Sequence, residues 1–188
     1  MPHFLVLSRG APAAGTTDDP GLDEAHWSYM DRFAPGMIAR GPTLTADRGT
    51  WTGSMHVVEL ADAAAARVFA EEEPYNRAGL YAHHRIWGYR DLLGRTMWEF
   101  ARTPGMPLFL VIAAGSRCDG PDPAGALGAG LLLCGELAAI DGGDPPGFAL
   151  ALQAPHGIAA EAALRAAGVD GVADPHVEIL DWEVGGRR

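Results

Sequence analysis

A constant spacing of 94 positions relates two parts of this 188-residue sequence. Four turn-forming residues in the first part recur in the second part at that spacing. They are Gly41, Asp47, Gly49 and Gly53, and their counterparts are Gly135, Asp141, Gly143 and Gly147. One shared spacing at four such positions seldom arises by chance, and an internal repeat decides the architecture before any local pattern does. The sequence therefore predicts one module written twice.

Each copy is built around a predicted β-hairpin. In the first copy, residues 37–39 and 55–60 are apolar runs, and Asp47-Arg48-Gly49 between them is a turn signal. In the second copy, residues 131–133 begin the corresponding first strand and residues 147–152 form the second. The hairpin is therefore the part of the module that both copies keep.

Helices and strands are predicted on both sides of the first hairpin. Their order is strand, helix, strand, strand, helix, strand, which is the ferredoxin-like arrangement. The flanking elements are a strand at 3–9, a helix at 24–33 capped by Asp23, a helix at 63–72 capped by Asp62, an ordered loop at 74–79 and a strand at 81–90.

The second copy follows the same order in a shortened form. Its first strand, 108–114, lies 105 positions after the first strand of the other copy, so 11 residues are missing before its hairpin. Residues 116–130 hold four Gly and two Pro, and at most a stub of helix fits there. A helix at 158–167 and a strand at 176–184 complete the copy.

These elements predict three segments and an α+β fold. Residues 1–94 form a ferredoxin-like domain, residues 95–107 a linker with a docking turn at 97–100, and residues 108–188 a degenerate repeat that lacks most of its first helix. Helices cover one face of a ferredoxin-like sheet, and its other, apolar face must also be buried. We expect the two sheets to pack against each other as an intrachain pseudo-dimer, an α+β barrel.

Composition excludes several classes of function. The net charge of −10 disfavours nucleic-acid binding, and the absence of Lys removes Schiff-base chemistry and a Walker lysine. Cys118 and Cys134 lack metal-site spacing and are expected to be free thiols. No run of 18 apolar residues and no leader pattern are present. We expect a cytoplasmic protein without a membrane partner, either a monomer with an internal pseudo-dimer or a homodimer.

The residues that could carry chemistry are concentrated in the first copy. His26 lies on its first predicted helix, Glu73 ends its second helix just before Pro74-Tyr75, and Ser54 opens the second hairpin strand. The second copy has lost the helix that would carry the histidine, and Ala166 to Asp170 contain no acid-Pro-Tyr element. We therefore expect one site per chain.

These residues belong to a series of short elements that resembles the YCII-related (YciI-like) family. The series, which spans about residues 3–94, is His26-Trp-Ser-Tyr-Met30, Gly41-Pro42, Asp47-Arg-Gly49, Gly53-Ser54, Glu73-Pro-Tyr75, Ala78-Gly-Leu80 and Ile86-Trp-Gly-Tyr-Arg90. The resemblance implies a dimeric α+β barrel with a His-Asp pair in a cleft, in which Glu73 stands for the family's Asp. It also implies elimination chemistry, because in one characterised relative such a pair removes halide from a chlorinated quinol-type ring.

A His-carboxylate pair supports acid–base chemistry without a metal or a redox cofactor. The carboxylate fixes the imidazole tautomer and raises its basicity, and the other ring nitrogen takes a proton. Ser54, with Arg9 or Arg90, is a candidate to hold an oxyanion, and Tyr75, Trp87 and Tyr89 are candidates for an apolar wall. His26 and Glu73 are the candidate catalytic residues.

Two classes of function follow from this pattern. The first is a cofactor-independent lyase or isomerase that acts by elimination, dehydration or proton transfer on a small cyclic or aromatic-derived metabolite. The alternative is a non-catalytic small-molecule binding or accessory protein with a vestigial site. A cofactor-free monooxygenase on the same barrel is a third option, to which no residue points.

Overall fold

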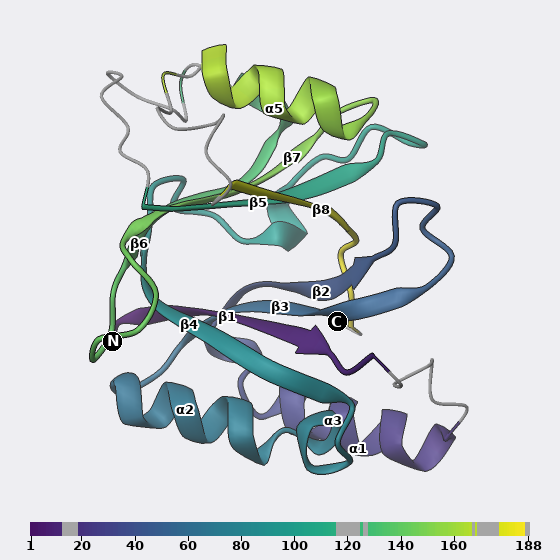
Figure 1. The fold of residues 1–188 in the computed structure, drawn as a ribbon, viewed down its shortest axis with the longest axis vertical. Helices are drawn as coiled ribbons and strands as arrows, with labels where there is room; N and C mark the ends of the chain where they lie inside the picture. The colour runs from purple at the N-terminus through teal and green to yellow at the C-terminus, as the bar shows by residue number, and fades with distance from the viewer. Residues whose placement is uncertain (13–18, 116–124, 126–127, 167, 169–176, 187–188) are drawn as a thin grey trace.

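The computed structural model describes residues 1–12, 19–115, 125, 128–166, 168 and 177–186. The first half of the chain supplies four strands and the helices that cover them (Figure 1). Its elements are β1 (His3–Gly10), α1 (Pro20–Asp31), η1 (Ala34–Gly36), β2 (Met37–Leu44), β3 (Trp51–Glu59), α2 (Ala63–Glu72), α3 (Pro74–Arg77) and β4 (Tyr81–Asp91).

The second half supplies four more strands, with α5 packed on them. Its elements are η2 (Met97–Glu99), β5 (Leu108–Ala114), η3 (Gly128–Gly130), β6 (Leu131–Ala138), β7 (Gly147–Gln153), α5 (Gly157–Ala166) and β8 (Val177–Trp182). The expected stub of helix in 116–130 falls largely outside the described residues. Strands 3–9 and 176–184 and helix 158–167 were each predicted to within two residues at either end.

The eight strands close into one antiparallel barrel in the order β1-β3-β2-β8-β5-β7-β6-β4. Each half contributes four adjacent strands, and the order within each half is fourth, first, third, second. Figure 1 shows the resulting layers: α1, α2 and α3 cover the β1–β4 side, and α5 covers the side formed by β5 to β8. The fold is therefore α+β, as predicted, with the sheets joined edge to edge into a closed barrel.

Two seams join the halves. β4 pairs with β6 over four residues, from Gly88 to Asp91, whereas β2 pairs with β8 only at Thr43 and Leu44. Both seams continue beyond the strands through backbone hydrogen bonds. The Leu92 N–H donates to the Cys134 carbonyl at 2.9 Å at one seam. At the other, the Glu183 N–H donates to the Pro42 carbonyl at 3.2 Å and the Gly185 N–H to the Arg40 carbonyl at 3.0 Å.

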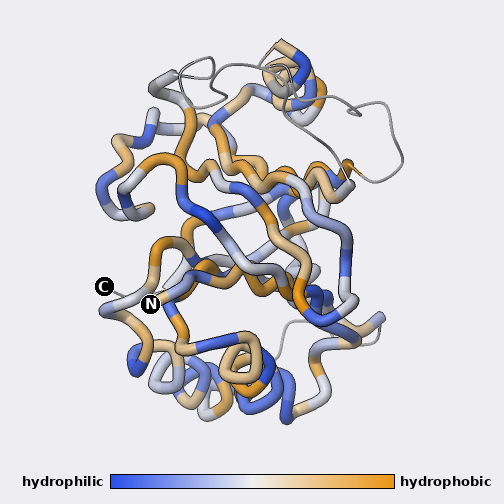
Figure 2. The backbone as a smooth tube through the Cα atoms, turned by 90° about the vertical axis from the view of Figure 1, so that its left-hand side faces the viewer, coloured by the Kyte–Doolittle hydropathy of each residue, from blue (hydrophilic) through white to orange (hydrophobic). Residues whose placement is uncertain are grey.

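Alternation along the strands divides the apolar core into an inner and an outer part. On β1, Leu5 and Leu7 point into the barrel, while Phe4 and Val6 point to the helices α1 and α2. Figure 2 shows the hydrophobic stretches along these strands. Burial of such a side chain stabilises the fold by about 1.5–3 kcal/mol. The parity of a residue on its strand therefore decides whether it faces the barrel interior or the helices.

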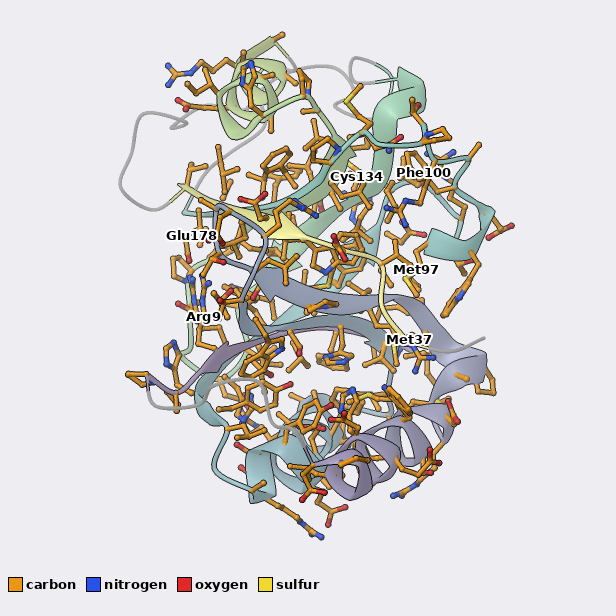
Figure 3. The ribbon with its side chains drawn as sticks, turned by 90° about the vertical axis from the view of Figure 1, so that its right-hand side faces the viewer. Arg9, Met37, Met97, Phe100, Cys134 and Glu178 are labelled. Carbon is orange, nitrogen blue, oxygen red and sulfur yellow. The ribbon has the colours of Figure 1, made fainter. Side chains whose placement is uncertain are left out.

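The segment after β4 docks as a turn, as predicted. Thr96 and Glu99 form a capping box around η2, and Met97 and Phe100 are buried in the inner core (Figure 3). The linker is thus packed against the barrel.

Helix α1 begins earlier than predicted. Its cap is Asp19, whose Oδ1 accepts the backbone N–H groups of Gly21 and Leu22, and the helix starts at Pro20 rather than at Glu24. The prediction that Asp23 is the cap was wrong, because Asp23 lies inside the first turn. The cap of α2 is Asp62, as predicted, and its Oδ1 accepts the Ala65 N–H at 2.8 Å. The predicted loop at 74–79 contains the short helix α3.

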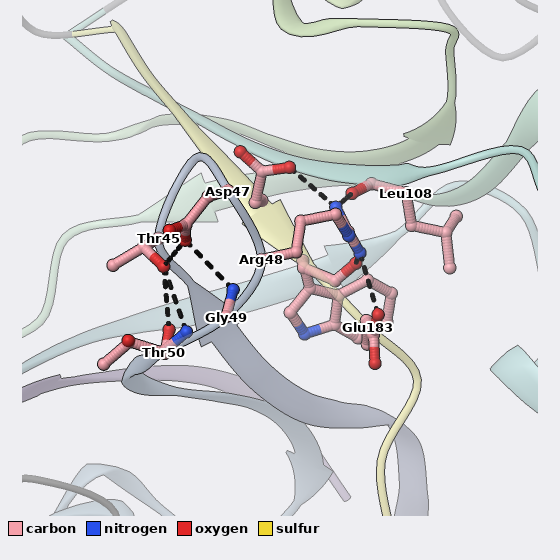
Figure 4. A network of polar contacts seen from close by, with 9 residues as sticks. Thr45, Asp47, Arg48, Gly49, Thr50, Leu108 and Glu183 are labelled. Carbon is pink, nitrogen blue, oxygen red and sulfur yellow. Dashed lines mark hydrogen bonds and ion pairs between the residues drawn. The ribbon is translucent and has the colours of Figure 1, made fainter.

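The turn between β2 and β3 reaches across to the other half (Figure 4). Asp47 accepts hydrogen bonds from Thr45 and from the Gly49 N–H, which fixes the turn. The Arg48 guanidinium then contacts Asp181 at 2.6 Å and Glu183 at 3.2 Å, both at the end of β8. The turn therefore reinforces the short β2–β8 seam.

Candidate functional site

His26 and Glu73 form a hydrogen-bonded pair between α1 and the junction of α2 with α3. His26 Nδ1 lies 2.5 Å from Glu73 Oε1. The His26 side chain is 13% exposed and that of Glu73 only 3%. With a carboxylate as its acceptor, Nδ1 carries the ring proton, and Nε2 is left with a lone pair. Nε2 makes no hydrogen bond to the part of the chain that the structure describes.

The fold holds the carboxylate of Glu73 from both sides. Glu73 lies between α2 and α3 and caps α3, because its Oε2 accepts the Asn76 backbone N–H at 3.1 Å. Pro74 starts α3 directly after it, a position that suits proline. One oxygen therefore anchors the carboxylate to the backbone while the other orients His26.

Tyr75 fixes the plane of the imidazole. Its ring stacks on His26 with the centroids 4.2 Å apart and 8° between the planes. The Tyr75 hydroxyl donates to Asp23 Oδ1 at 2.7 Å, which ties α3 to α1. Burial, together with the hydrogen bond and negative charge of Asp23, raises the pKa of Tyr75 well above its ordinary value. Tyr75 therefore stays a neutral phenol beside the pair.

His26, but not Glu73, lines a cavity of about 260 Å³ between the helices and the outer face of the sheet. The floor comes from β2 and β3, and one wall comes from the segment that follows β8 in the other half. The lining residues are His26, Trp27, Arg40, Gly41, Pro42, Trp51, Ser54, His56, Tyr75, Gly185 and Gly186. Residues from both halves of the chain therefore enclose it.

Two floor residues, His56 and Arg40, were not among the predicted site residues. His56 on β3 is 3% exposed, and its ring centroid lies 6.4 Å from that of His26. Burial lowers the pKa of His56 to about 3, and electrostatic interaction with His26 and with Arg40 acts in the same direction. Arg40 is 4% exposed and is the cross-strand neighbour of His56. The cavity thus combines a neutral imidazole with a guanidinium.

Ser54 lies on the same floor, as the sequence predicted. Its Oγ accepts a hydrogen bond from the Tyr81 hydroxyl at 2.8 Å. Burial raises the pKa of Tyr81 well above its ordinary value, so the tyrosine keeps its proton and remains the donor. The hydrogen of the Ser54 hydroxyl is therefore left to donate elsewhere.

Arg9 and Trp87, predicted as substrate-binding residues, do not line this cavity. Both occupy strand positions whose side chains point into the barrel, as those of Leu5 and Leu7 do. Arg9 pairs with Glu178 (Figure 3), and the fully buried Trp87 donates its indole N–H to the Pro145 carbonyl at 3.2 Å. Tyr89 is also an inner-core residue, and Arg90 pairs with Glu136 at the β4–β6 seam.

A wider groove of about 650 Å³ lies on the other side of α1. Arg32, Glu72 and Arg77 line it together with apolar residues, but it contains no histidine. Among the described residues, no three His, Cys, Asp or Glu side chains are grouped as metal ligands would be. We therefore assign the His26 cavity as the candidate active site.

Family and curated-sequence comparisons give one match. Residues 3–90 match the profile of the YCII-related domain. No curated protein sequence matches this chain. Within the described residues, no helix has the length and apolar character needed to span a membrane.

Solved structures similar to this chain include the following three. A 5-chloro-2-hydroxyhydroquinone dehydrochlorinase from Burkholderia phenoliruptrix AC1100, in complex with 2,5-dihydroxybenzoquinone, is 26% identical over 45% of this chain and 89% of its own, with a TM-score of 0.38. A protein provisionally assigned as a chlorite dismutase is 14% identical over 98% and 94%, with a TM-score of 0.56. A provisionally assigned monooxygenase from Lactobacillus acidophilus NCFM is 10% identical over 98% and 97%, with a TM-score of 0.47. The second likeness shows a shared α+β barrel fold.

Proposed function

Since residues 3–90 form a YCII-related domain, we propose that this chain is a cofactor-independent acid–base enzyme of the lyase or isomerase type that acts on a small metabolite. The observation that carries the proposal is the 2.5 Å contact between His26 Nδ1 and Glu73 Oε1 at the edge of a cavity. His26 is the general base, and Glu73 is its positioning residue.

The geometry supports proton abstraction by His26 Nε2. The buried Glu73 holds Nδ1–H, so that the lone pair of Nε2 is directed away from the carboxylate. When Nε2 takes a proton, the imidazolium forms next to a carboxylate that is already in place, and the charge is stabilised without reorganisation. The same imidazolium can return the proton to another atom of the substrate. Isomerisation consists of two such transfers. In dehydration the second transfer protonates the departing hydroxyl group, and in elimination of halide the proton abstraction is accompanied by departure of the halide ion with the electron pair of its bond to carbon.

Substitution of His26 tests the proposal. The panel of compounds contains enolisable ketones, phenols and chlorinated hydroxyhydroquinones, the class named for the dehydrochlorinase. Exchange of substrate hydrogen in D₂O is followed by NMR, and halide release is measured in parallel. His26→Gln keeps the size of the side chain but removes the base, and turnover should fall at least about 100-fold.

His83→Gln is the matched control, because His83 is exposed on β4 and does not line the cavity. It should keep the turnover of the wild type. Turnover of His26→Gln within about threefold of the wild type, roughly 0.65 kcal/mol of barrier, would leave the non-catalytic binding protein as the better reading.

We also propose that residues 1–94 and 108–188 are two copies of one ferredoxin-like unit. The strand order within the halves is the same, and the hairpin registers agree at the 94-residue spacing. Arg40 pairs with His56 and Gly41 with Met55, while Cys134 pairs with Leu150 and Gly135 with Ala149. This agreement defines which positions of the two halves are equivalent.

A further inference from the structure

Three polar side chains form the floor of the cavity, opposite His26. Arg40 lies on β2, and Ser54 and His56 lie two residues apart on β3, so all three point to the same face of the sheet. They are 4%, 6% and 3% exposed. Three nearly buried polar groups on one patch of sheet are unusual, because desolvation of polar groups opposes folding.

The other half shows that the fold does not need polar residues there. At the equivalent register positions it has Cys134, Phe148 and Leu150. All three are buried, and they pack in the apolar cluster that lies against α5. The same sheet, with the same pairing, therefore closes with apolar residues. The polar floor of the first half must have a purpose other than folding.

The protonation and the hydrogen bonding of His56 indicate what the polar floor does. Its Nδ1 is buried and has no hydrogen-bond partner within the described residues, although buried polar atoms normally have one. Burial keeps the pKa of His56 near 3, so the ring is neutral and offers one N–H donor and one acceptor. Its neighbour Ser54 has a hydroxyl hydrogen available, because Tyr81 already donates to the Ser54 oxygen.

We propose that Arg40, Ser54 and His56 form an oxyanion-binding floor, which selects small ketones, enols or phenols as ligands. The inference rests on the proposed function and names its substrate class. His26 Nε2 takes the proton from an O–H group, whose electron pair stays on the ligand oxygen, or from a carbon next to a carbonyl group. In the second case the electron pair of the C–H bond forms a C=C bond, and the π pair of the carbonyl group moves onto its oxygen. This oxygen then receives hydrogen bonds from the floor, and the charge of Arg40 stabilises it.

Binding of 4-nitrophenol to the intact protein tests the floor separately from catalysis. The phenolate resembles the charged ligand, and its absorbance reports its ionisation state. The wild type should bind the phenolate in preference to the phenol and lower its apparent pKa. His56→Leu and Arg40→Met should each weaken phenolate binding at least tenfold, whereas the exposed control His83→Leu should not change it.

Leucine is the residue that the other half has at the His56 position, so His56→Leu is expected to fold. A second measurement uses the wild type alone: the ¹⁵N resonances of the His56 ring should shift when 4-nitrophenol is added. Phenolate affinity within twofold of the wild type in both floor variants, or no phenolate binding by the wild type, would overturn the proposal.

Failure of this inference and failure of the proposed function give different results. If His26→Gln loses turnover but the floor variants bind phenolate like the wild type, the function stands and the floor assignment falls. If the floor variants lose phenolate binding but His26→Gln keeps full turnover, the floor assignment stands and the acid–base function falls.

Discussion

Glu73 has two hydrogen bonds with different demands on the length of its side chain. The cap of α3 needs only an acceptor, and Asp is a good N-cap residue, but the contact with His26 needs the full reach of glutamate. Glu73→Asp should therefore keep the melting temperature within about 2 °C of the wild type and lower turnover by roughly tenfold. Glu73→Gln should lower turnover further, because it cannot balance the imidazolium charge, but less than His26→Gln.

Steady-state kinetics with circular dichroism melting curves measure both effects. Equal turnover of Glu73→Asp, Glu73→Gln and the wild type would show that the carboxylate does not orient the base.

His56 predicts a pH dependence of stability. Its pKa is near 6.5 in the unfolded chain and about 3 in the fold, so between these values the unfolded state binds one more proton. The contribution of neutral His56 to the unfolding free energy is fully present above pH 6.5. It is lost as the pH falls toward 3. Between pH 7.5 and 5, the wild type should lose about 2 kcal/mol more of its unfolding free energy than His56→Leu does.

Urea denaturation of both proteins at several pH values measures this difference, in which the other titrating groups cancel. Parallel pH profiles for the two proteins would show that His56 titrates normally in the folded state.

The sequence predicted some of the residues that meet at the candidate site and missed others for a physical reason. His26, Ser54 and Tyr75 lie in short family elements and line one cavity. Glu73, from another such element, contacts His26 but does not line the cavity. His56 and Arg40 were missed because each is embedded in an apolar strand. Arg9 and Trp87 were placed in the site, yet they face the barrel interior. Alternation shows that a strand has two faces, but not which face the helices cover.

At the scale of elements, Arg48 links the β2–β3 turn to the end of β8 through two carboxylates and the Trp182 carbonyl. The Arg48 side chain is only 24% exposed, so solvent weakens these contacts less than on an open surface. Arg48→Ala should lower the unfolding free energy by about 1–2 kcal/mol, which corresponds to a melting temperature roughly 2–8 °C lower.

Arg90→Ala is the control, since Arg90 pairs with Glu136 across the other seam but is largely exposed. It should leave the melting temperature nearly unchanged. Equal effects of the two substitutions in differential scanning calorimetry would contradict a special role for the Arg48 contacts.

The predicted boundaries of helices were accurate where the capping and stop residues in the sequence were clear. Helix α2 begins and ends where Asp62 and Pro74 indicate. For α1, the prediction of Asp23 as the cap was wrong, because Asp19 caps the helix. The proline that follows Asp19 was the better signal, because proline favours the first position of a helix. The short helix α3 could not be separated from an ordered loop by pattern alone, because four residues are too few for periodicity.

For the whole molecule, the narrow β2–β8 seam depends on a glycine. A Cβ atom at position 41 would lie 1.8 Å from the Glu183 carbonyl oxygen, which belongs to the backbone and has little room to move. Gly41→Ala should therefore separate the segment 183–186 from β2 and lower the unfolding free energy by about 2 kcal/mol, or roughly 4–8 °C in melting temperature.

Gly49→Ala is the matched control, because a Cβ atom there would meet nothing closer than 3.5 Å. Hydrogen exchange should speed up at 183–186 in Gly41→Ala only. Unchanged exchange in that segment would show that the seam tolerates the methyl group.

The barrel could be expected from the sequence because both halves keep the same glycines and aspartate in their hairpins. The prediction that Gly53 and Gly147 form turns was wrong, because they lie in β3 and β7. A close approach requires glycine there: a Cβ atom at either would lie 2.1 Å from a carbonyl oxygen, of Ser8 and Ala113 respectively. The edge-to-edge joining at the seams was not predictable, because it depends on pairings between residues as far apart as Thr43 and Trp182. No local pattern encodes such a contact.

Both seams join parts of one polypeptide, and this changes how the barrel can vary. In a symmetrical pair of identical chains, each substitution is present twice, so an improvement in one cavity is imposed on the other. Along a single chain, His56 and Leu150 occupy equivalent positions and can differ. Closure of the barrel also does not depend on protein concentration, since its two halves cannot dilute apart. Selection can thus act on the candidate site in one half and on packing in the other, at separate codons of one gene.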